Sequence, residues 1–295
     1  MRFPSFFEHQ IRFAAPFRLL LALICVLAAA PLGGQKRPEP VKSARLYVFD
    51  CGVLDIPDTD RYNLKPEELA THYMSDACFL IVHPRGTLMW DTGVVADSEF
   101  PRDGSPGKLN YATVAKPLLP QLAAAGYTPK DITYVAFSHF HWDHVGNGNA
   151  FAGSTWLVRQ KERDIMFAEP PSDRTVPAHY AALKNSKTVI VKDDEYDVFG
   201  DGSVIMKSAP GHSPDHQVLL VKLRKTGPVL LSGDLWHYPE ERKLNRYPKT
   251  EFNVEQTKAS RQVIEAYLKK TGAQLWIQHD YTGNQKLRKA PEYYE

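Results

Sequence analysis

The feature that most constrains this chain is the segment 138–146, which directly follows the apolar run Thr133–Phe137. The run predicts a buried strand, and the segment after it has the pattern H-x-H-x-D-H. Burying three imidazoles and a carboxylate side by side without a metal ion would leave polar groups unsatisfied at high cost. The ligand-type residues of the motif are His139, His141, Asp143 and His144.

The spacing within the motif indicates how these side chains are presented. In an extended segment His139, His141 and Asp143 project to one side. The adjacent His144 needs a turn, which we attribute to the conformational freedom of Gly146. A loop of this kind presents ligands to two neighbouring ions, but the motif alone supplies too few of them for two metals.

Three further ligand-type residues lie later in the chain, each after a strand-like run: His212, Asp234 and His279. The runs that precede them are Val204–Lys207, Val229–Leu231 and Leu275–Ile277. Loops at one edge of a rigid sheet scaffold converge, and binding sites concentrate there. The sequence therefore predicts a site for two metal ions at such an edge.

The remaining patterns indicate an α/β fold. Further strands are predicted at Arg45–Phe49, Cys78–His83, Thr87–Trp90, Thr188–Val191 and Val218–Leu223, with a hairpin turn at 84–86. Helices are predicted from Leu118 to a stop at Gly126, and from Asn253 to Gly272 with Gln256 completing a capping box. Residues 92–113 carry no steady period and predict a long loop. Each half of the chain after the leader thus consists of strands with flanking helices. This pattern predicts an αββα sandwich of two mixed sheets, in one domain over 44–295.

Residues 1–34 have the layout of a secretory signal peptide, because three arginines precede the apolar run Leu19–Leu32. That run is shorter than the roughly 20 residues that span a bilayer. We expect export to a periplasm or the medium, with a membrane anchor if the leader is not cleaved, and a linker over 35–43. Cys51 and Cys78 suit one disulfide or two buried thiols, and we expect both residues to be buried.

Charge excludes one class of partner. The whole chain has a formal net charge of +2, and without residues 1–34 its basic and acidic residues balance. A nucleic-acid partner is therefore not expected, and the expected partner is a small-molecule substrate. The sequence does not indicate an oligomeric state.

The motif and the three later ligands resemble the metallo-β-lactamase superfamily over nearly all of the chain after the leader. The resemblance implies that one ion takes His139, His141 and His212, that the other takes Asp143, His144 and His279, and that Asp234 bridges the two. It implies two divalent metal ions per chain. Zinc is the expected metal, and iron, manganese and cobalt are the alternatives. Two such ions roughly 3.5–4 Å apart lower the pKa of a shared water to about 7, so a bridging hydroxide can attack a carbonyl carbon.

The ligand spacing and the segments 46–52 and 91–93 look like those of the N-acyl-homoserine lactonases, which open the lactone ring of quorum-sensing signals. Asp143 or Asp234 is then the expected proton carrier. That group often has a substrate-facing Tyr three residues after its bridging Asp, where this chain has His237. We therefore expect a substrate wall formed by Trp236, His237 and Tyr238. His216, His237 and Asp280 are either partners that orient the ligands or exposed polar residues.

Other activities share this ligand set. The strongest alternative is an organophosphate or aryl ester hydrolase, followed by a glyoxalase II-like thioesterase. True β-lactamases usually lack a carboxylate at the Asp234 position, which disfavours that activity. An alternative from a different functional class is a metal-dependent binding module without catalytic activity. A complete set of ligands for two ions and a nucleophilic water disfavours it.

Overall fold

The structure, a computed structural model, describes residues 40–295. The predicted leader and residues 35–39 of the predicted linker lie outside the described residues. Residues 40–295 lie within one compact unit. Val41 and Ala44 are already buried in its core, so packing begins within the predicted linker and not at residue 44. Within residues 40–295 the structure has no helix with the length and apolar character needed to cross a membrane.

The larger sheet of the described unit has nine strands in the order β4-β5-β1-β2-β3-β6-β7-β8, with β14 also paired to β1. Its strands are β1 (Arg45–Asp55), β2 (Tyr73–His83), β3 (Gly86–Trp90), β4 (Gly107–Leu109), β5 (Ala112–Val114), β6 (Tyr134–Ala136), β7 (Thr155–Val158), β8 (Thr188–Ile190) and β14 (Tyr293–Tyr294). The predicted β2–β3 hairpin is confirmed as an antiparallel pair, whereas β3, β6, β7 and β8 run parallel. The sheet is therefore mixed, as predicted.

The second sheet has five strands in the order β13-β12-β11-β10-β9. They are β9 (Glu195–Asp197), β10 (Val204–Ser208), β11 (Gln217–Leu223), β12 (Gly227–Leu231) and β13 (Gln274–Trp276). The pairs from β9 to β12 are antiparallel, and β12 pairs in parallel with β13. The carboxyl ends of β10, β12 and β13 carry the three later ligand candidates.

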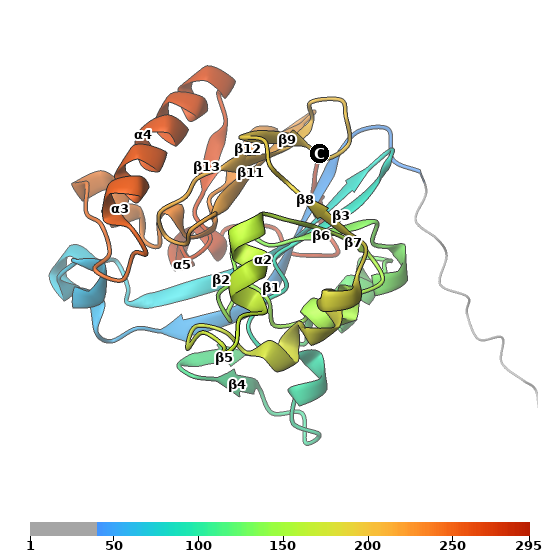
Figure 1. Cartoon of the computed structure of the whole chain (residues 1–295), viewed down its shortest axis with the longest axis horizontal. Coiled ribbons are helices and arrows are strands. Elements are labelled where there is room, and N and C mark those ends of the chain that lie inside the picture. The colour runs from blue at the N-terminus through green and yellow to red at the C-terminus, as the bar shows by residue number, and fades with distance from the viewer. Residues whose placement is uncertain (1–39) are drawn as a thin grey trace, which may run out of the picture. The chain divides into compact units, whose positions relative to one another are not determined.

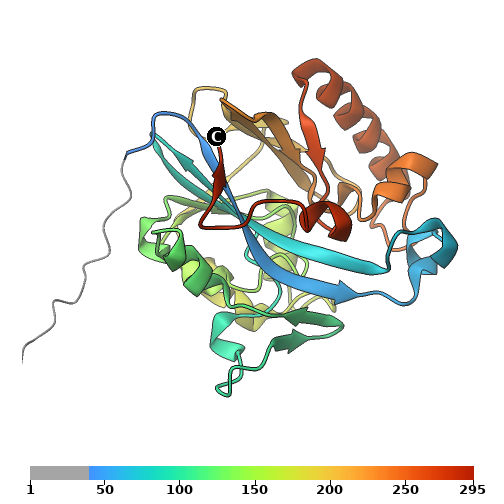
Figure 2. The ribbon, with the colours of Figure 1, turned by 180° about the vertical axis from the view of Figure 1, so that it is seen from behind.

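The two sheets pack face to face, with helices on their outer faces (Figures 1 and 2). Strand residues alternate between the two sides of a sheet, so Leu46 and Val48 of β1 meet Val229 and Leu231 of β12 in the core between the sheets. The alternate residues of β1, such as Tyr47, pack under the outer helices. This arrangement is the predicted αββα sandwich.

The helices are α1 (Leu118–Ala124), α2 (Gln160–Met166), α3 (Pro239–Leu244), α4 (Val254–Thr271) and α5 (Tyr281–Asn284). α1 and α2 bury apolar side chains on the larger sheet, and α4 does so on the smaller one. The predicted cap of α4 forms only in part. The Asn253 side chain accepts a hydrogen bond from the Gln256 N–H (3.0 Å), but the Asn253 N–H donates to Gly211 O (2.8 Å) and not to Gln256. That bond ties the start of α4 to the loop that carries His212.

The prediction of a loop over 92–113 is wrong in part. Residues 107–114 form the β4–β5 hairpin, and β5 pairs with the end of β1 at Val53 and Leu54. Three-residue strands are too short to show a period of two, and it is their pairing with the long β1 that stabilises them. Strands β7, β9 and β14 and helices α2, α3 and α5 were also not predicted.

Cys51 of β1 and Cys78 of β2 form a disulfide, which decides between the two alternatives that the sequence left open, and both residues are buried as expected. Gly93 packs directly over this bond. A Cβ on Gly93 would lie 2.8 Å from the Cβ of Cys51, closer than side chains approach each other. The disulfide thus lies beneath the loop that begins at Asp91, next to the ligand-rich motif.

Candidate metal centre

All seven predicted ligands lie together at the carboxyl ends of the strands, and each is no more than 7% exposed. The motif residues occupy the loop after β6, whereas His212, Asp234 and His279 follow β10, β12 and β13. Their ligand atoms fall into two groups, His139, His141, His212 and Asp234 in one and Asp143, His144 and His279 in the other.

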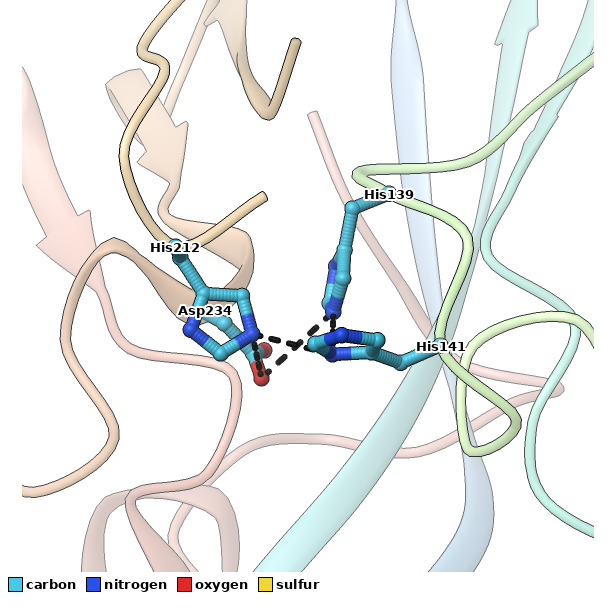
Figure 3. A group of neighbouring side chains, drawn as sticks. All are labelled: His139, His141, His212 and Asp234. Carbon is cyan, nitrogen blue, oxygen red and sulfur yellow. Dashed lines mark hydrogen bonds and ion pairs between the residues drawn. The ribbon is translucent and has the colours of Figure 1, made fainter. Parts of the chain in front are cut away.

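In the first group three imidazoles point toward one another (Figure 3). The Nε2 atom of His139 lies 2.6 Å from Nδ1 of His141, and Nε2 of His212 lies 3.0 Å from the same atom. Burial is the largest cause that lowers the pKa of both His139 and His141 well below its usual value. Both rings are therefore neutral, as a metal ligand must be.

In the second group the ligand atoms of Asp143 and the two histidines lie farther apart than the imidazole nitrogens of the first group. Asp143 Oδ2 lies 3.8 Å from Nε2 of both His144 and His279. Burial lowers the pKa of His144, but the charges of Asp234, Asp91 and Asp143 outweigh burial and raise it well above the usual value. A positive charge is thus stabilised at this position.

Asp234 lies between the two groups. Its Oδ1 is 3.1 Å from Nε2 of both His144 and His279, while its Oδ2 is 3.3 Å from Nε2 of His212 and 3.8 Å from Nε2 of His139. Burial raises the pKa of Asp234, but the surrounding histidines, His279 first, outweigh burial and hold it well below its usual value. The carboxylate is therefore ionised and faces both groups at once.

Two buried atoms of the centre lack a hydrogen-bond partner, namely Nε2 of His144 and Oδ1 of Asp234. Buried polar atoms are satisfied in most proteins, and a cation between these two would satisfy both. Imidazole and carboxylate are ligands that suit divalent transition metals. The residues present thus fit two metal ions.

Further carboxylates and carbonyls fix the orientation of the imidazoles. Asp91 Oδ2 lies 3.0 Å from Nδ1 of His144, and Glu251 Oε1 lies 3.2 Å from Nδ1 of His212. Nδ1 of His279 lies 2.8 Å from Ser75 O. Such contacts fix the tautomer and increase the basicity of a ligating ring. The sequence did not identify these partners, because each lies far along the chain from its histidine.

Glu162 of α2 is a second feature that the sequence did not reveal. It accepts hydrogen bonds from the N–H of Phe140, the hydroxyl of Ser213 and the N–H of Asp215 at 2.6–3.0 Å. Burial raises its pKa to about 7. One carboxylate thereby joins the motif loop to the loop of His212.

The three polar neighbours of the ligands have different roles. His216 Nε2 accepts a hydrogen bond from the Asp234 N–H (3.0 Å) and so holds the central carboxylate in place. His237 lies 3.3 Å from Asp234 Oδ2 and 3.2 Å from Glu241 Oε1. Burial lowers the pKa of His237, but Glu241 and Asp234 outweigh it and raise the value to about 10. Asp280 accepts a hydrogen bond from the Gly283 N–H and caps α5.

Only one of the three predicted wall residues lies on the metal cavity. His237 lines this cavity, which has a volume of about 70 Å³. Its wall also includes Arg61, Tyr111 and Arg174. Trp236 is buried against α4, and the hydroxyl of Tyr238 donates to His72 O (2.9 Å). Side chains alternate along an extended segment, so the neighbours of His237 point elsewhere.

Gly146 has a different role from the one predicted, since it does not adopt a left-handed conformation. Its N–H donates to Gly93 O (2.6 Å), and a Cβ on Gly146 would lie 2.5 Å from that same oxygen. Glycine is needed here for the close approach of two backbones. That contact joins the motif loop to the loop of Asp91.

The family model described as "Metallo-beta-lactamase superfamily" matches residues 75–274. The chain belongs to this superfamily. The N-acyl homoserine lactonase AttM of Azorhizobium caulinodans is 31% identical over 266 residues, covering 85% of this chain and 98% of the relative. AiiA of Bacillus thuringiensis subsp. kurstaki, also named an N-acyl homoserine lactonase, is 27% identical over 73% of this chain and 85% of its own length.

Several solved structures share the fold of this chain. A quorum-quenching N-acyl homoserine lactone lactonase has a TM-score of 0.71 at 24% identity, over 86% of this chain and 99% of its own. A hydrolase with the product N-hexanoyl-L-homoserine at its catalytic metal centre has a TM-score of 0.70 at 24% identity, over 84% and 98%. AidC, described as a dizinc lactonase, has a TM-score of 0.63 at 19% identity, over 85% and 94%.

Proposed function

We propose that this metallo-β-lactamase superfamily member hydrolyses the lactone ring of N-acyl-homoserine lactones with two bound divalent ions, zinc being the first candidate. The observation that carries the proposal is Asp234, whose two oxygens face two separate groups of histidines. Relatives of about 30% identity that align over nearly their whole length carry this activity in their names. One ion would take His139, His141 and His212, the other Asp143, His144 and His279, with Asp234 shared.

When bound, the pair of ions would lower the pKa of a water and polarise the ester carbonyl. The side chains of the protein itself position the substrate and carry the proton of the water to the leaving oxygen. Arg61, Tyr111 and Arg174 are donors on the cavity wall that can hold substrate oxygens. Asp234 is held by histidines on both sides, so Asp143 is the freer carboxylate. Asp143 would take the proton of the attacking water and deliver it to the ring oxygen as the C–O bond breaks, giving a hydroxy acid.

The test of this function is a substrate panel with the purified, metal-loaded protein. We expect turnover of N-acyl-homoserine lactones to exceed that of a phosphotriester, S-lactoylglutathione and nitrocefin by at least about tenfold in kcat/KM. Proton release reports ring opening directly. Faster hydrolysis of the phosphotriester or the thioester would replace this proposal by the corresponding alternative.

His237 lies where related lactonases often have a substrate-facing tyrosine, and it contacts Asp234 directly. We expect His237→Ala to lower kcat/KM for a lactone by roughly ten- to a hundredfold, the range for residues that support metal ligands. His237→Gln, which keeps a hydrogen-bonding group, should recover part of the loss. An unchanged kcat/KM in the alanine variant would remove His237 from the mechanism.

We also propose that the chain is exported. The leader pattern of residues 1–34 supports this, and so does the disulfide between Cys51 and Cys78, because disulfides persist in oxidising compartments. Fractionation of cells that express the full chain tests it. We expect a processed form outside the cytoplasm, and a full-length cytoplasmic protein would contradict export.

A further inference from the structure

A chain of buried charged side chains leads from helix α4 to the metal cavity. Arg261 of α4 donates from Nη2 to Oε2 of Glu241 in α3 (2.5 Å). The other oxygen of Glu241, Oε1, lies 3.2 Å from Nδ1 of His237 and accepts a hydrogen bond from the His237 N–H (3.3 Å). Nε2 of His237 in turn lies 3.3 Å from Oδ2 of Asp234. We call Glu241 and Arg261 the supporting pair.

Stability alone is a weak reason for the supporting pair. Glu241 is fully buried and Arg261 is 5% exposed. Taking both charges out of water is costly, and a buried ion pair is often no more stabilising than apolar side chains of similar size. The pair therefore points to a role that apolar side chains could not take, and the contact between Glu241 and His237 supplies one.

Arg261 is itself fixed at three points. Besides its bond to Glu241, its Nε donates to Leu235 O (2.7 Å) and its Nη1 donates to Arg246 O (2.5 Å). The guanidinium is a rigid planar fork, so it cannot turn without breaking several of these hydrogen bonds at once. The carboxylate of Glu241 is therefore held with Oε1 toward His237.

The ring of His237 is also held by its neighbours. It packs against the ring of Tyr62 with 4.9 Å between centroids, and it stacks on the ring of His279 at 5.8 Å with an interplanar angle of 6°. Its two nitrogens have different surroundings, because Nδ1 is buried next to Glu241 whereas Nε2 is next to Asp234. His237 lines the metal cavity, so Nε2 is the nitrogen that a substrate there can meet.

We propose that Glu241 and Arg261 are positioning residues that act through His237, an inference that rests on the proposed lactonase function. They hold the imidazole so that its Nε2 meets the substrate at the place where related lactonases often have a tyrosine. A tyrosine has one polar atom at the end of its ring. An imidazole has two nitrogens, so it needs a partner that fixes which of them faces the substrate. The supporting pair is that partner.

The test is a double-mutant cycle on kcat/KM for one N-acyl-homoserine lactone. We expect Glu241→Gln, which keeps the size of the side chain and removes its charge, to lower kcat/KM by roughly tenfold. In the His237→Ala background the same substitution should lower kcat/KM by no more than about twofold, because residues that act as a unit are not additive. If the two losses multiply instead, Glu241 acts independently of His237 and the proposal is wrong.

Two further variants separate positioning from folding. Should Glu241→Gln fail to fold, Arg261→Lys takes its place in the cycle, since lysine keeps the positive charge beside Glu241 but not the planar fork. We expect a loss of several-fold that again disappears in the His237→Ala background. The matched control is Glu240→Gln, the same change at the half-buried neighbour in α3, which should leave kcat/KM unchanged.

The NMR signals of the His237 ring nitrogens, in protein labelled at histidine, give a readout apart from activity. We expect these signals, identified by their loss in His237→Ala, to shift in Glu241→Gln and to stay in place in Glu240→Gln. Signals that do not move in Glu241→Gln would also overturn the proposal. If the native protein opens no lactone, it is the proposed function that fails, and the same signals still decide whether Glu241 fixes the ring.

Discussion

Asp234→Ala is expected to reduce lactone turnover by about a thousandfold or more, beyond the ten- to hundredfold typical of residues that only orient ligands. The reason is that one carboxylate faces both ligand groups, within 3.1 Å of His144 and His279 and 3.3 Å of His212. Without the Asp234 carboxylate, no negatively charged group lies between the two groups of buried imidazoles. We expect metal content, measured on the purified variant, to fall from about two ions per chain to one or fewer.

Two companion variants make this result specific. Asp234→Asn keeps the size of the side chain but removes its charge, and we expect an intermediate loss of metal. Asp103→Ala changes an exposed aspartate far from the ligands in sequence and should leave both metal content and rate as they are. An alanine variant at position 234 that retains two ions and more than about a tenth of the native rate would contradict the bridging role.

The sequence predicted which seven ligand candidates would lie together, because each of them comes soon after a strand. Once β6, β10, β12 and β13 are recognised, the alternation of their side chains and the packing of two sheets bring the four strand ends to one edge. His212 and His279 are far apart along the chain, yet the position of each at a strand end was enough to group them.

The residues that support the ligands were not predictable in the same way. Glu162 and Glu251 precede or lie in helices, and nothing in their local sequence distinguishes them from exposed glutamates. Their roles arise only from packing, which buries one carboxylate against two loops and brings the other to His212. Trp236 and Tyr238 do not line the metal cavity for a related reason, since closeness in sequence to Asp234 does not decide which way a side chain points.

The centre also contributes to stability, and removing the metal should show how much. We expect treatment with a strong chelator to abolish lactone hydrolysis and to lower Tm by about 10 °C, since a ligand present at a thousandfold above its Kd stabilises by roughly 4 kcal/mol and each kcal/mol shifts Tm by about 2–4 °C in a domain of this size. The two sheets have their own backbone hydrogen bonds and the larger one carries the disulfide, so we expect β content measured by circular dichroism to persist.

Addition of zinc, manganese, cobalt or ferrous ion to the chelated protein then ranks the metals by the rate and Tm that each restores. Asp234→Ala provides the decisive comparison, because a centre that no longer holds the ion pair has less stability to lose on chelation. We therefore expect the chelator to lower its Tm by no more than about half as much as that of the native protein. If the native protein instead kept both its rate and its Tm without metal, the buried histidines and carboxylates would have to be satisfied by one another, and the metal-dependent chemistry proposed for this chain would be wrong.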